Sequence, residues 1–238
     1  MYSAVRKLVL SLVRERFHAR RANAFLTLMK PQDDISILDV GGGWGDFLAR
    51  IRKRVRARFV VAEMGEYYAP IIRQKYGFKF AQLEEGKPLP FVDKEFDIVI
   101  SISVIEHVTM PKEVCMSKIS QENWVSNSLE RQRQFANEIR RVGKAYFVQT
   151  PHKDFPIESH TWLPLVNWLS HPHTVSLVRY TDKYWVKKCG YVDWNLLGVT
   201  DMKRFFPEAQ ICIERAFGLP KAIIAFTSPQ PDNKSSCG

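Results

Sequence analysis

The segment ILDVGGGWGDFL, residues 37–48, joins an apolar run, an aspartate and a glycine-rich turn. Glycine permits tight turns and lets a ligand approach bare backbone, so this loop is expected to border a binding site. Asp39 ends the apolar run, and Asp46 opens the helix predicted to follow. The dinucleotide pattern G-x-G-x-x-G is absent, and an aspartate at a helix start would repel a pyrophosphate. The spacing therefore favours a nucleotide-like ligand without phosphate and disfavours a nicotinamide oxidoreductase. Four glycines form the loop: Gly41, Gly42, Gly43 and Gly45.

Acidic residues follow the next apolar runs along the chain. Glu63 lies at the end of RFVVAEM, residues 58–64, where a carboxylate can accept hydrogen bonds from both hydroxyls of a ribose. Glu84 or Glu85 follows FKFAQL, where an acceptor can bind the amino group of adenine. A single loop carboxylate is usually only solvated, but three at successive strand ends beside a glycine turn indicate a nucleoside site.

His107 lies in SVIEHV, directly after the apolar run FDIVISIS. A neutral imidazole there is the first candidate for a general base, because its pKa lies near physiological pH. The alternative is that Glu106 and His107 cap the next helix or brace the loop.

A second polar cluster lies in QTPHKDFPIESHTWLP, residues 149–164. His152, Glu158 and His160 fall in one proline-punctuated loop, which makes both histidines further catalytic candidates. Their spacing matches no standard metal site, so no metal is expected. Bracing of the loop and contact with a substrate remain the alternatives.

The elements that position these residues alternate between apolar runs and helical stretches, which indicates an α/β fold with a parallel sheet covered on both faces. Helices are predicted over 46–55 and 129–142, whereas His171 and His173 flank Pro172 in a predicted turn. Two final strands, 209–215 and 221–228, are separated by too few residues for a crossover helix, so they are expected to form an antiparallel hairpin. The other strands are predicted over 35–40, 58–64, 78–83, 96–103 and 144–150.

Taken in order, LDVGGGWG, Glu63, PLPFVDKEFDIV and SVIEHV resemble the class I S-adenosylmethionine-dependent methyltransferases, particularly the type-11 methyltransferase-domain group. The likeness runs from about Ile35 to Phe226. It implies a doubly wound, mostly parallel, seven-stranded Rossmann-like sheet with a reversed last strand. One departure is the segment 109–128, which is longer than such relatives usually have and either sets acceptor choice or packs outside the pocket.

The resemblance also implies a cofactor, S-adenosyl-L-methionine, and its binding residues. Asp39 and the glycine loop would hold its amino-acid end, Glu63 its ribose, and the segment Glu84–Glu85 would lie near adenine. Met64 and Ser103 complete the expected cofactor-binding set. The acceptor is expected to be a small or lipid-like molecule, with its oxygen, nitrogen or carbon atom left open. The alternatives are a non-catalytic cofactor-binding partner subunit and a methyltransferase acting on nucleic acid.

Three regions are expected: a basic amphipathic helix over 1–30, a methyltransferase domain over 31–228 and a disordered tail over 229–238. The helix either packs over the domain or lies on anionic lipid. The net charge of +10 favours acidic partners, but no N/D-P-P-Y/F motif or RNA-binding module is present, which disfavours nucleic acid. No signal peptide or membrane span is recognised, so the expected location is the cytoplasm, with peripheral membrane contact through residues 1–30.

Overall fold

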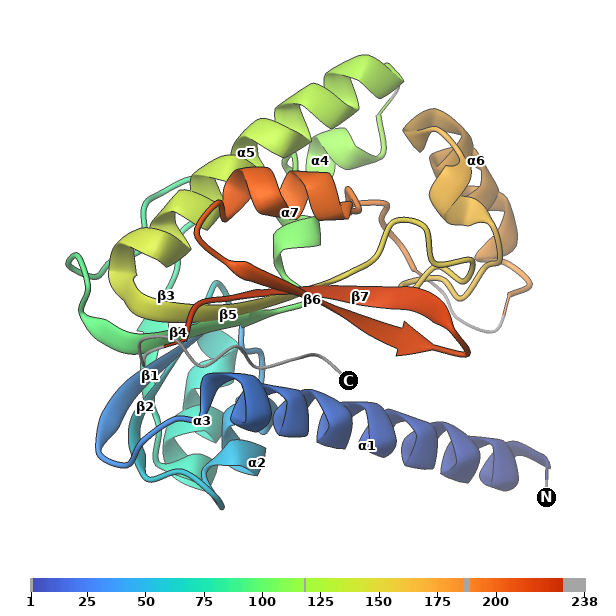
Figure 1. Cartoon of the computed structure of the whole chain (residues 1–238). Helices are drawn as coiled ribbons and strands as arrows, with labels where there is room; N and C mark the ends of the chain where they lie inside the picture. The colour runs from blue at the N-terminus through green and yellow to red at the C-terminus, as the bar shows by residue number, and fades with distance from the viewer. Residues whose placement is uncertain (1, 118, 186–188, 229–238) are drawn as a thin grey trace. The chain divides into compact units, whose positions relative to one another are not determined.

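A computed structural model of the chain describes residues 2–117, 119–185 and 189–228, with side chains from residue 15 onwards. Within these ranges seven strands form one sheet in the order β3-β2-β1-β4-β5-β7-β6 (Figure 1). The central strand β1 pairs in parallel with β2 and β4, and β2 pairs in parallel with β3. The last two strands form an antiparallel hairpin, so the expected mostly parallel α/β fold is confirmed.

Contacts divide the chain into two compact units. Of the described residues, unit 1 contains 2–100, 142–147 and 226–228, and unit 2 contains 101–141 and 148–225. The glycine loop belongs to unit 1 and the candidate histidines belong to unit 2. The predicted tail, 229–238, lies outside the described residues.

Unit 1 is built around β1 and β2, whose interiors are buried. The helix predicted over 46–55 ends at Ile51, because the next residues turn back and donate backbone hydrogen bonds to the Ile51 carbonyl. Near the end of α1, Phe25 packs edge-on against Phe47 and Phe147 and is fully buried. The elements are α1 Tyr2–Met29, β1 Ile35–Val40, α2 Asp46–Ile51, β2 Ala57–Glu63, η1 Glu66–Tyr68, α3 Ala69–Tyr76 and β3 Lys79–Gln82.

The chain passes from unit 1 into unit 2 within β4, and unit 2 holds most of the helices after that strand. Its long helix begins at Gln121 rather than near Leu129, because the Ser120 hydroxyl caps the Asn123 N–H at 3.2 Å and Trp124 is buried. The segment 109–128 therefore contains a short helix and the first turns of the long one. The elements are β4 Phe96–Ile102, η2 Ile105–His107, α4 Lys112–Cys115, α5 Gln121–Val142, β5 Gly143–Pro151, η3 Val166–Trp168, α6 His171–Thr181 and α7 Val199–Phe205.

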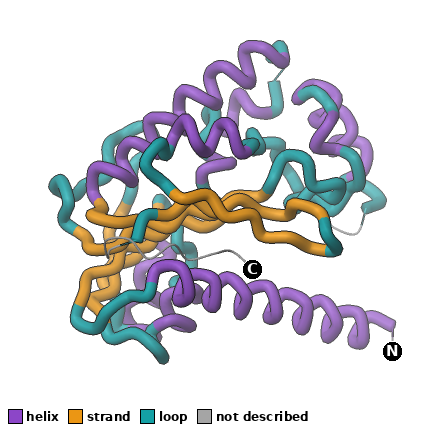
Figure 2. The backbone as a smooth tube through the Cα atoms, viewed as in Figure 1, coloured by secondary structure: helices purple, strands orange, loops and turns teal. Residues whose placement is uncertain are grey.

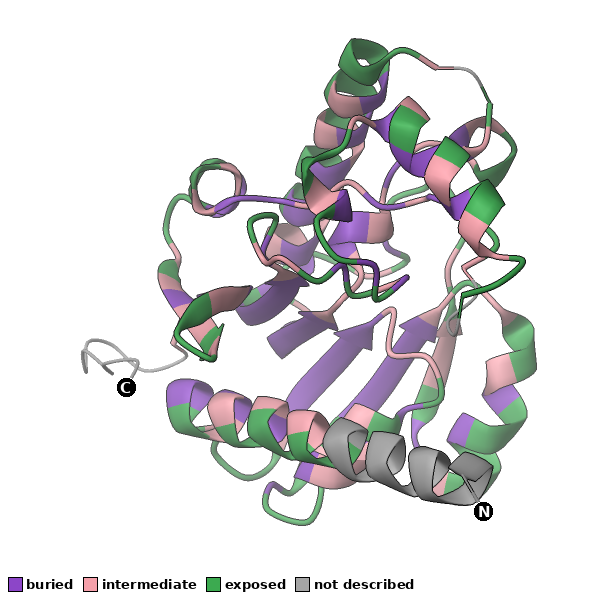
Figure 3. Cartoon of the chain, turned by 90° about the vertical axis from the view of Figure 1, so that its right-hand side faces the viewer, coloured by how far each residue is buried: buried purple, intermediate pink, exposed green. Residues whose placement is uncertain are grey.

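The C-terminal hairpin joins β6, Gln210–Ala216, to β7, Leu219–Phe226, through two residues (Figure 2). Phe217 and Gly218 both have positive φ, 52° and 79°, as the favoured two-residue hairpin turn requires. Burial is concentrated on the strands of the sheet, whereas the helices expose one face (Figure 3). Among the helices of the described residues, none has the length and apolar character needed to cross a membrane.

Candidate functional site

The glycine loop in unit 1 follows β1 and closes on itself. The Gly41 N–H donates to the Ala62 carbonyl at 2.8 Å, and the Gly45 N–H donates to the Gly42 carbonyl at 2.9 Å. Gly41, Gly43 and Gly45 have φ values of 72°, 52° and 78°. This left-handed region favours glycine, which explains three of the four glycines in the loop.

Asp39 lies beneath this loop with 2% of its surface exposed, and its Oδ2 atom has no hydrogen-bond partner. A Cβ at Gly42 would lie 2.7 Å from Asp39 Oδ2, so the fourth glycine leaves space above the carboxyl group. Burial, followed by the negative charge of Glu63, raises the pKa of Asp39 to about 8. A buried carboxyl oxygen without a donor is costly unless a ligand supplies one, so this site fits a ligand that carries an ammonium group.

Glu63 is held in place at the end of β2 by two backbone donors. Its Oε2 accepts the Gly43 N–H at 3.0 Å, and its Oε1 accepts the Met64 N–H at 2.8 Å. Each carboxylate oxygen retains a further lone pair, so the group can also accept hydrogen bonds from two sugar hydroxyls.

The Glu84–Glu85 segment starts next to this acid, since the Leu83 N–H donates to the Glu63 carbonyl at 2.9 Å. Both glutamates are exposed, and Glu84 forms an ion pair with Lys87 at 2.5 Å. A role for either residue in binding adenine stays a prediction.

An exposed aromatic cluster borders the loop in unit 1, and sequence reasoning missed it. The Trp44 ring lies 4.6 Å from that of Tyr68, which lies 4.2 Å from that of Tyr67. The hydrogen bond with Tyr67 and then burial raise the pKa of Tyr68 to about 12. The position of Trp44 inside the glycine loop was the available signal.

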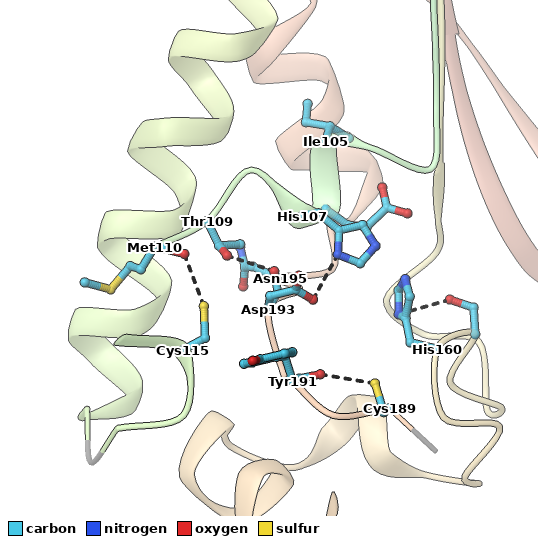
Figure 4. Close-up of polar contacts among 12 residues, drawn as sticks. Ile105, His107, Thr109, Met110, Cys115, His160, Cys189, Tyr191, Asp193 and Asn195 are labelled. Atoms are coloured by element: carbon cyan, nitrogen blue, oxygen red, sulfur yellow. Dashed lines mark hydrogen bonds and ion pairs between the residues drawn. The ribbon is translucent and has the colours of Figure 1, made fainter. Parts of the chain in front are cut away.

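In unit 2, His107, at the end of η2, and His160, in the loop after β5, lie together (Figure 4). Their rings are 4.6 Å apart and nearly perpendicular. The Nδ1 atom of His107 lies 3.0 Å from Asp193 Oδ1, and the Asp193 carbonyl accepts the Thr109 hydroxyl at 2.8 Å. His107 and Asp193 are 86 residues apart in the chain, so no local pattern predicted this pair.

The electrostatic environment of His107 is negative. Burial lowers its pKa, but the hydrogen bond to Asp193 and the charges of the neighbouring carboxylates raise it by more, so the net pKa lies above its usual value. The negative charges of this region also act on Cys189. Burial and then the charges of Glu158 and Asp193 raise the pKa of its thiol to about 11.

Glu158 is fully buried and braces the His160 loop. It accepts the His160 Nδ1 at 2.5 Å and both the N–H and the hydroxyl of Thr161. Burial raises the pKa of Glu158, but the bonds and charge of His160 and the bonds from Thr161 outweigh it and lower the pKa to about 2. Glu158 therefore positions His160.

Glu106 is also fully buried. Its Oε2 accepts the Thr150 hydroxyl at 2.9 Å, whereas its Oε1 has no hydrogen-bond partner. On α5, Gln132 fixes the backbone beside it, because its Nε2 donates to the carbonyls of Ile105 and Asn195, each at 2.9 Å. In the part of the chain that the structure describes, Glu106, His107 and His160 offer ligand atoms within 4.8 Å of one another.

The other two predicted site residues of unit 2 make local contacts. His152 is buried, and its Nδ1 accepts the Asp154 N–H at 3.1 Å, so it braces its own turn. Burial lowers the pKa of His152. Ser103 has φ 55° and donates its N–H to the Gln149 carbonyl at 2.8 Å, which ties the end of β4 to β5. A catalytic role for His152 and a cofactor contact for Ser103 stay predictions.

Comparison with known proteins matches part of the chain to a family model. Residues 37–121, which include the glycine loop, Glu63 and His107, match the sequence model of a methyltransferase domain. The seven-stranded order with its antiparallel end is the class I methyltransferase fold. A methyltransferase-domain model therefore matches residues 37–121, and solved structures that share the fold include enzymes with bound S-adenosylhomocysteine. No curated protein sequence matches the chain.

Solved structures share the fold at low sequence identity. A magnesium protoporphyrin IX methyltransferase from Synechocystis with bound S-adenosylhomocysteine has a TM-score of 0.51 and 11% identity, covering 90% of this chain and 84% of that one. A mycolic acid cyclopropane synthase, also with S-adenosylhomocysteine, has a TM-score of 0.51 and 15% identity. The match covers 83% of this chain and 61% of that one. A putative Zn-dependent alcohol dehydrogenase from Rhodobacter sphaeroides has a TM-score of 0.57 and 10% identity, and the match covers 88% of each chain. At these identities each likeness shows the fold alone.

Proposed function

We propose that this chain transfers the methyl group of S-adenosylmethionine to a small or lipid-like acceptor and belongs to the type-11 methyltransferase-domain group. The observation that carries the proposal is the unpartnered Oδ2 of Asp39, buried beneath a glycine loop whose neighbour Glu63 can accept sugar hydroxyls. When bound, the cofactor supplies an electrophilic methyl group on a sulfonium.

The residues of unit 1 fit this cofactor by charge and hydrogen bonding. Asp39 would accept the ammonium group of the amino-acid end, and the space above Gly42 leaves room for it. Glu63 would accept the ribose hydroxyls. Met64 follows it in the chain, and the Glu84–Glu85 segment begins beside it, where the Leu83 N–H donates to the Glu63 carbonyl.

Activation of the acceptor is assigned to the histidines of unit 2. An oxygen or carbon acceptor must lose a proton, and His107 is the group we assign to take it. Asp193 fixes the His107 ring by accepting a hydrogen bond from its Nδ1–H, which leaves the Nε2 lone pair for the acceptor. A carbon or oxygen atom with an acidic proton is therefore the expected target.

A lipid-like acceptor is supported by the apolar surface of unit 2. Between residues 157 and 191, many large apolar side chains are exposed, far more densely than elsewhere in the described chain. Two of the structural neighbours, the cyclopropane synthase and the porphyrin methyltransferase, are named for large apolar or aromatic substrates. The exposed residues include Ile157, Trp162, Leu165, Trp168, Leu169, Tyr180, Tyr184 and Tyr191.

Peripheral contact with an anionic membrane is proposed for the first part of α1. Residues Ala22, Phe25 and Met29, near its end, are buried and anchor the helix. The residues before them include Arg6, Lys7 and Arg14, which would attract anionic lipid.

The first experiment is calorimetric titration of the purified chain with S-adenosylmethionine, S-adenosylhomocysteine and NAD. We expect micromolar binding of the two adenosyl ligands and none of NAD. Glu63→Ala should weaken binding by about 10- to 100-fold for each sugar hydroxyl that it accepts, since a charge-assisted hydrogen bond is worth about 1.5–3 kcal/mol. Glu84→Ala, on the exposed turn, tests the adenine contact separately. Binding of NAD alone would refute the proposal.

The second experiment tests the acceptor half. His107→Ala should abolish methyl transfer in a screen of lipid and small-molecule extracts while leaving the affinity for S-adenosylhomocysteine unchanged. Turnover near that of the unsubstituted chain would remove His107 from the mechanism.

A further inference from the structure

The two histidines of unit 2 are oriented alike, each by a carboxylate on the same ring nitrogen. His107 Nδ1 lies 3.0 Å from Asp193, and His160 Nδ1 lies 2.5 Å from Glu158. An ionised carboxylate only accepts hydrogen bonds, so each Nδ1 carries the proton and each Nε2 keeps its lone pair. This carboxylate–histidine arrangement is the one that usually fixes histidine ligands of metal ions.

Glu106 supplies the third donor. It is fully buried, and its Oε1 has no partner, while its Oε2 is held by the Thr150 hydroxyl. A buried carboxylate oxygen without a partner lowers the stability of the folded chain, so this atom is suited to bind a positively charged group. The backbone that carries Glu106 and His107 is fixed by Gln132.

The charge of the cluster also favours a cation. Glu106, Glu158 and Asp193 bring three carboxylates to two imidazoles, and within the described residues their ion pairs are made with histidines and with no lysine or arginine. About a third of the His107 side chain and 18% of the His160 side chain are exposed, which gives an ion a path from solvent.

We propose that Glu106, His107 and His160 bind a divalent transition-metal ion, with zinc as the best fit. Two imidazoles and one carboxylate form the ligand set of catalytic zinc sites, which keep a further position open. Zinc–ligand bonds of about 2.0–2.2 Å place tetrahedral ligand atoms about 3.4 Å apart. Since the three ligand atoms lie within 4.8 Å, the site must contract by about 1.4 Å at most.

The inference deepens the proposed function and rests on its assignment of acceptor activation to this cluster. A metal ion polarises an oxygen that binds at its open position and lowers the pKa of a hydroxyl there. With the ion bound, His107 is a ligand in place of a base, and the proton of a bound hydroxyl passes to solvent water, which the part-exposed cluster admits. The favoured acceptor is a molecule that bears a hydroxyl group.

The experiment measures binding of Zn²⁺ and Co²⁺ to the full chain after removal of metals with a chelator. We expect one ion per chain, with a dissociation constant of about 1 μM or tighter. The Co²⁺ form should show the visible absorption of a four- or five-coordinate ion, a readout that needs neither cofactor nor acceptor.

The variants separate ligands from other histidines. His160→Ala and Glu106→Gln should each weaken Zn²⁺ binding by more than about 100-fold, and Asp193→Asn by about 10- to 100-fold, as loss of a partner that orients a ligand does. His173→Ala is the matched control, because His173 is exposed on α6 and its Nδ1 contacts the Ser170 hydroxyl. Circular dichroism identifies any variant that fails to fold, and His160→Ala, on a loop, remains informative if Glu106→Gln does not fold.

Absence of Zn²⁺ and Co²⁺ binding, or equal binding by His160→Ala and His173→Ala, would overturn the metal site. S-adenosylhomocysteine titration of the same metal-free protein separates this failure from failure of the proposed function. Retained binding of that ligand leaves the methyltransferase assignment in place, whereas its loss removes that assignment and leaves the metal result to stand by itself.

Discussion

At the scale of single residues, the proposed role of Asp39 in holding an ammonium group would couple ligand binding to the release of a proton. Burial and the charge of Glu63 raise its pKa to about 8, so at pH 7 the carboxyl group is mostly protonated in the ligand-free protein. A cationic group bound at Asp39 would favour the ionised form, so binding there would release a proton.

We expect cofactor affinity to rise between pH 6 and pH 8, by about tenfold per pH unit at most, and to level off above the pKa of Asp39. Calorimetry at pH 7 in two buffers of different ionisation enthalpy should show about one proton released per ligand. Asp39→Asn, which cannot ionise, should bind weakly and show no such release. Equal proton release by this variant would assign the effect to another group.

Gly42 and Gly43 are adjacent but constrained for different reasons. A Cβ at Gly42 meets Asp39 Oδ2 at 2.7 Å and Val61 at 3.0 Å, whereas a Cβ at Gly43 meets nothing within 4 Å but must adopt φ +52°. Gly42→Ala should therefore displace Asp39 and reduce cofactor affinity by more than about tenfold. Gly43→Ala should mainly lower the free energy of unfolding, by about 1–2 kcal/mol. Titration and urea denaturation of both variants check this, and the reverse ranking for affinity would contradict it.

At the scale of elements, α5 holds the His107 segment in place through one side chain. Gln132 is fully buried, donates to the carbonyls of Ile105 and Asn195, and accepts the Asn195 amide at 3.0 Å. Replacing it with leucine leaves these buried polar groups without partners.

Gln132→Leu should lower the free energy of unfolding by about 2–4 kcal/mol and reduce turnover, with cofactor affinity retained. Gln134→Leu, exposed on the same helix, should change the free energy of unfolding by less than about 0.5 kcal/mol. Urea denaturation and single-turnover assays provide the comparison. A stable, fully active Gln132→Leu chain would show that the segment is held by other contacts.

The elements that sequence patterns predicted well are those whose signal is local. Alternating apolar runs and turn residues located the seven strands, and the short link before β7 predicted the hairpin. The start of α5 was wrong because its first turns are polar and depend on burial of Trp124. His171 and His173 were predicted in a turn but lie in the first turn of α6, where Pro172 fits because its missing N–H is not needed.

The candidate site was predictable only in part, for a related reason. The glycine loop and Glu63 are close in the sequence and belong to consecutive strands, so their association follows from the order of elements. Asp193 pairs with His107 across 86 residues and carries no pattern of its own. His160 was grouped with His152 and Glu158 because they share a loop, but its ring packs against His107.

At the scale of the whole molecule, the net positive charge predicts binding to anionic membranes. The net charge of +10 should draw the chain to anionic vesicles, with binding that weakens at high salt. Replacing Arg6, Lys7 and Arg14 with glutamine should reduce vesicle binding by roughly 100-fold, at about 1 kcal/mol for each cation. A control that removes the same charge from exposed Lys112, Lys183 and Lys203 should lose much less. Sedimentation with vesicles measures both, and equal losses would show that total charge, and not α1, governs binding.

The two backbone N–H groups that hold Glu63 have a consequence for which analogues the protein tolerates. A carboxylate fixed by Gly43 and Met64 cannot swing to another donor when one sugar hydroxyl is missing. A 2′- or 3′-deoxy analogue of S-adenosylhomocysteine would therefore displace water from the carboxylate without replacing the hydrogen bond that the water made. Sites that hydrogen-bond a substrate hydroxyl strongly reject analogues that lack it. If Glu63 binds the ribose as proposed, the rigidity of this one acid sets the selectivity between ribose and deoxyribose before any ligand binds.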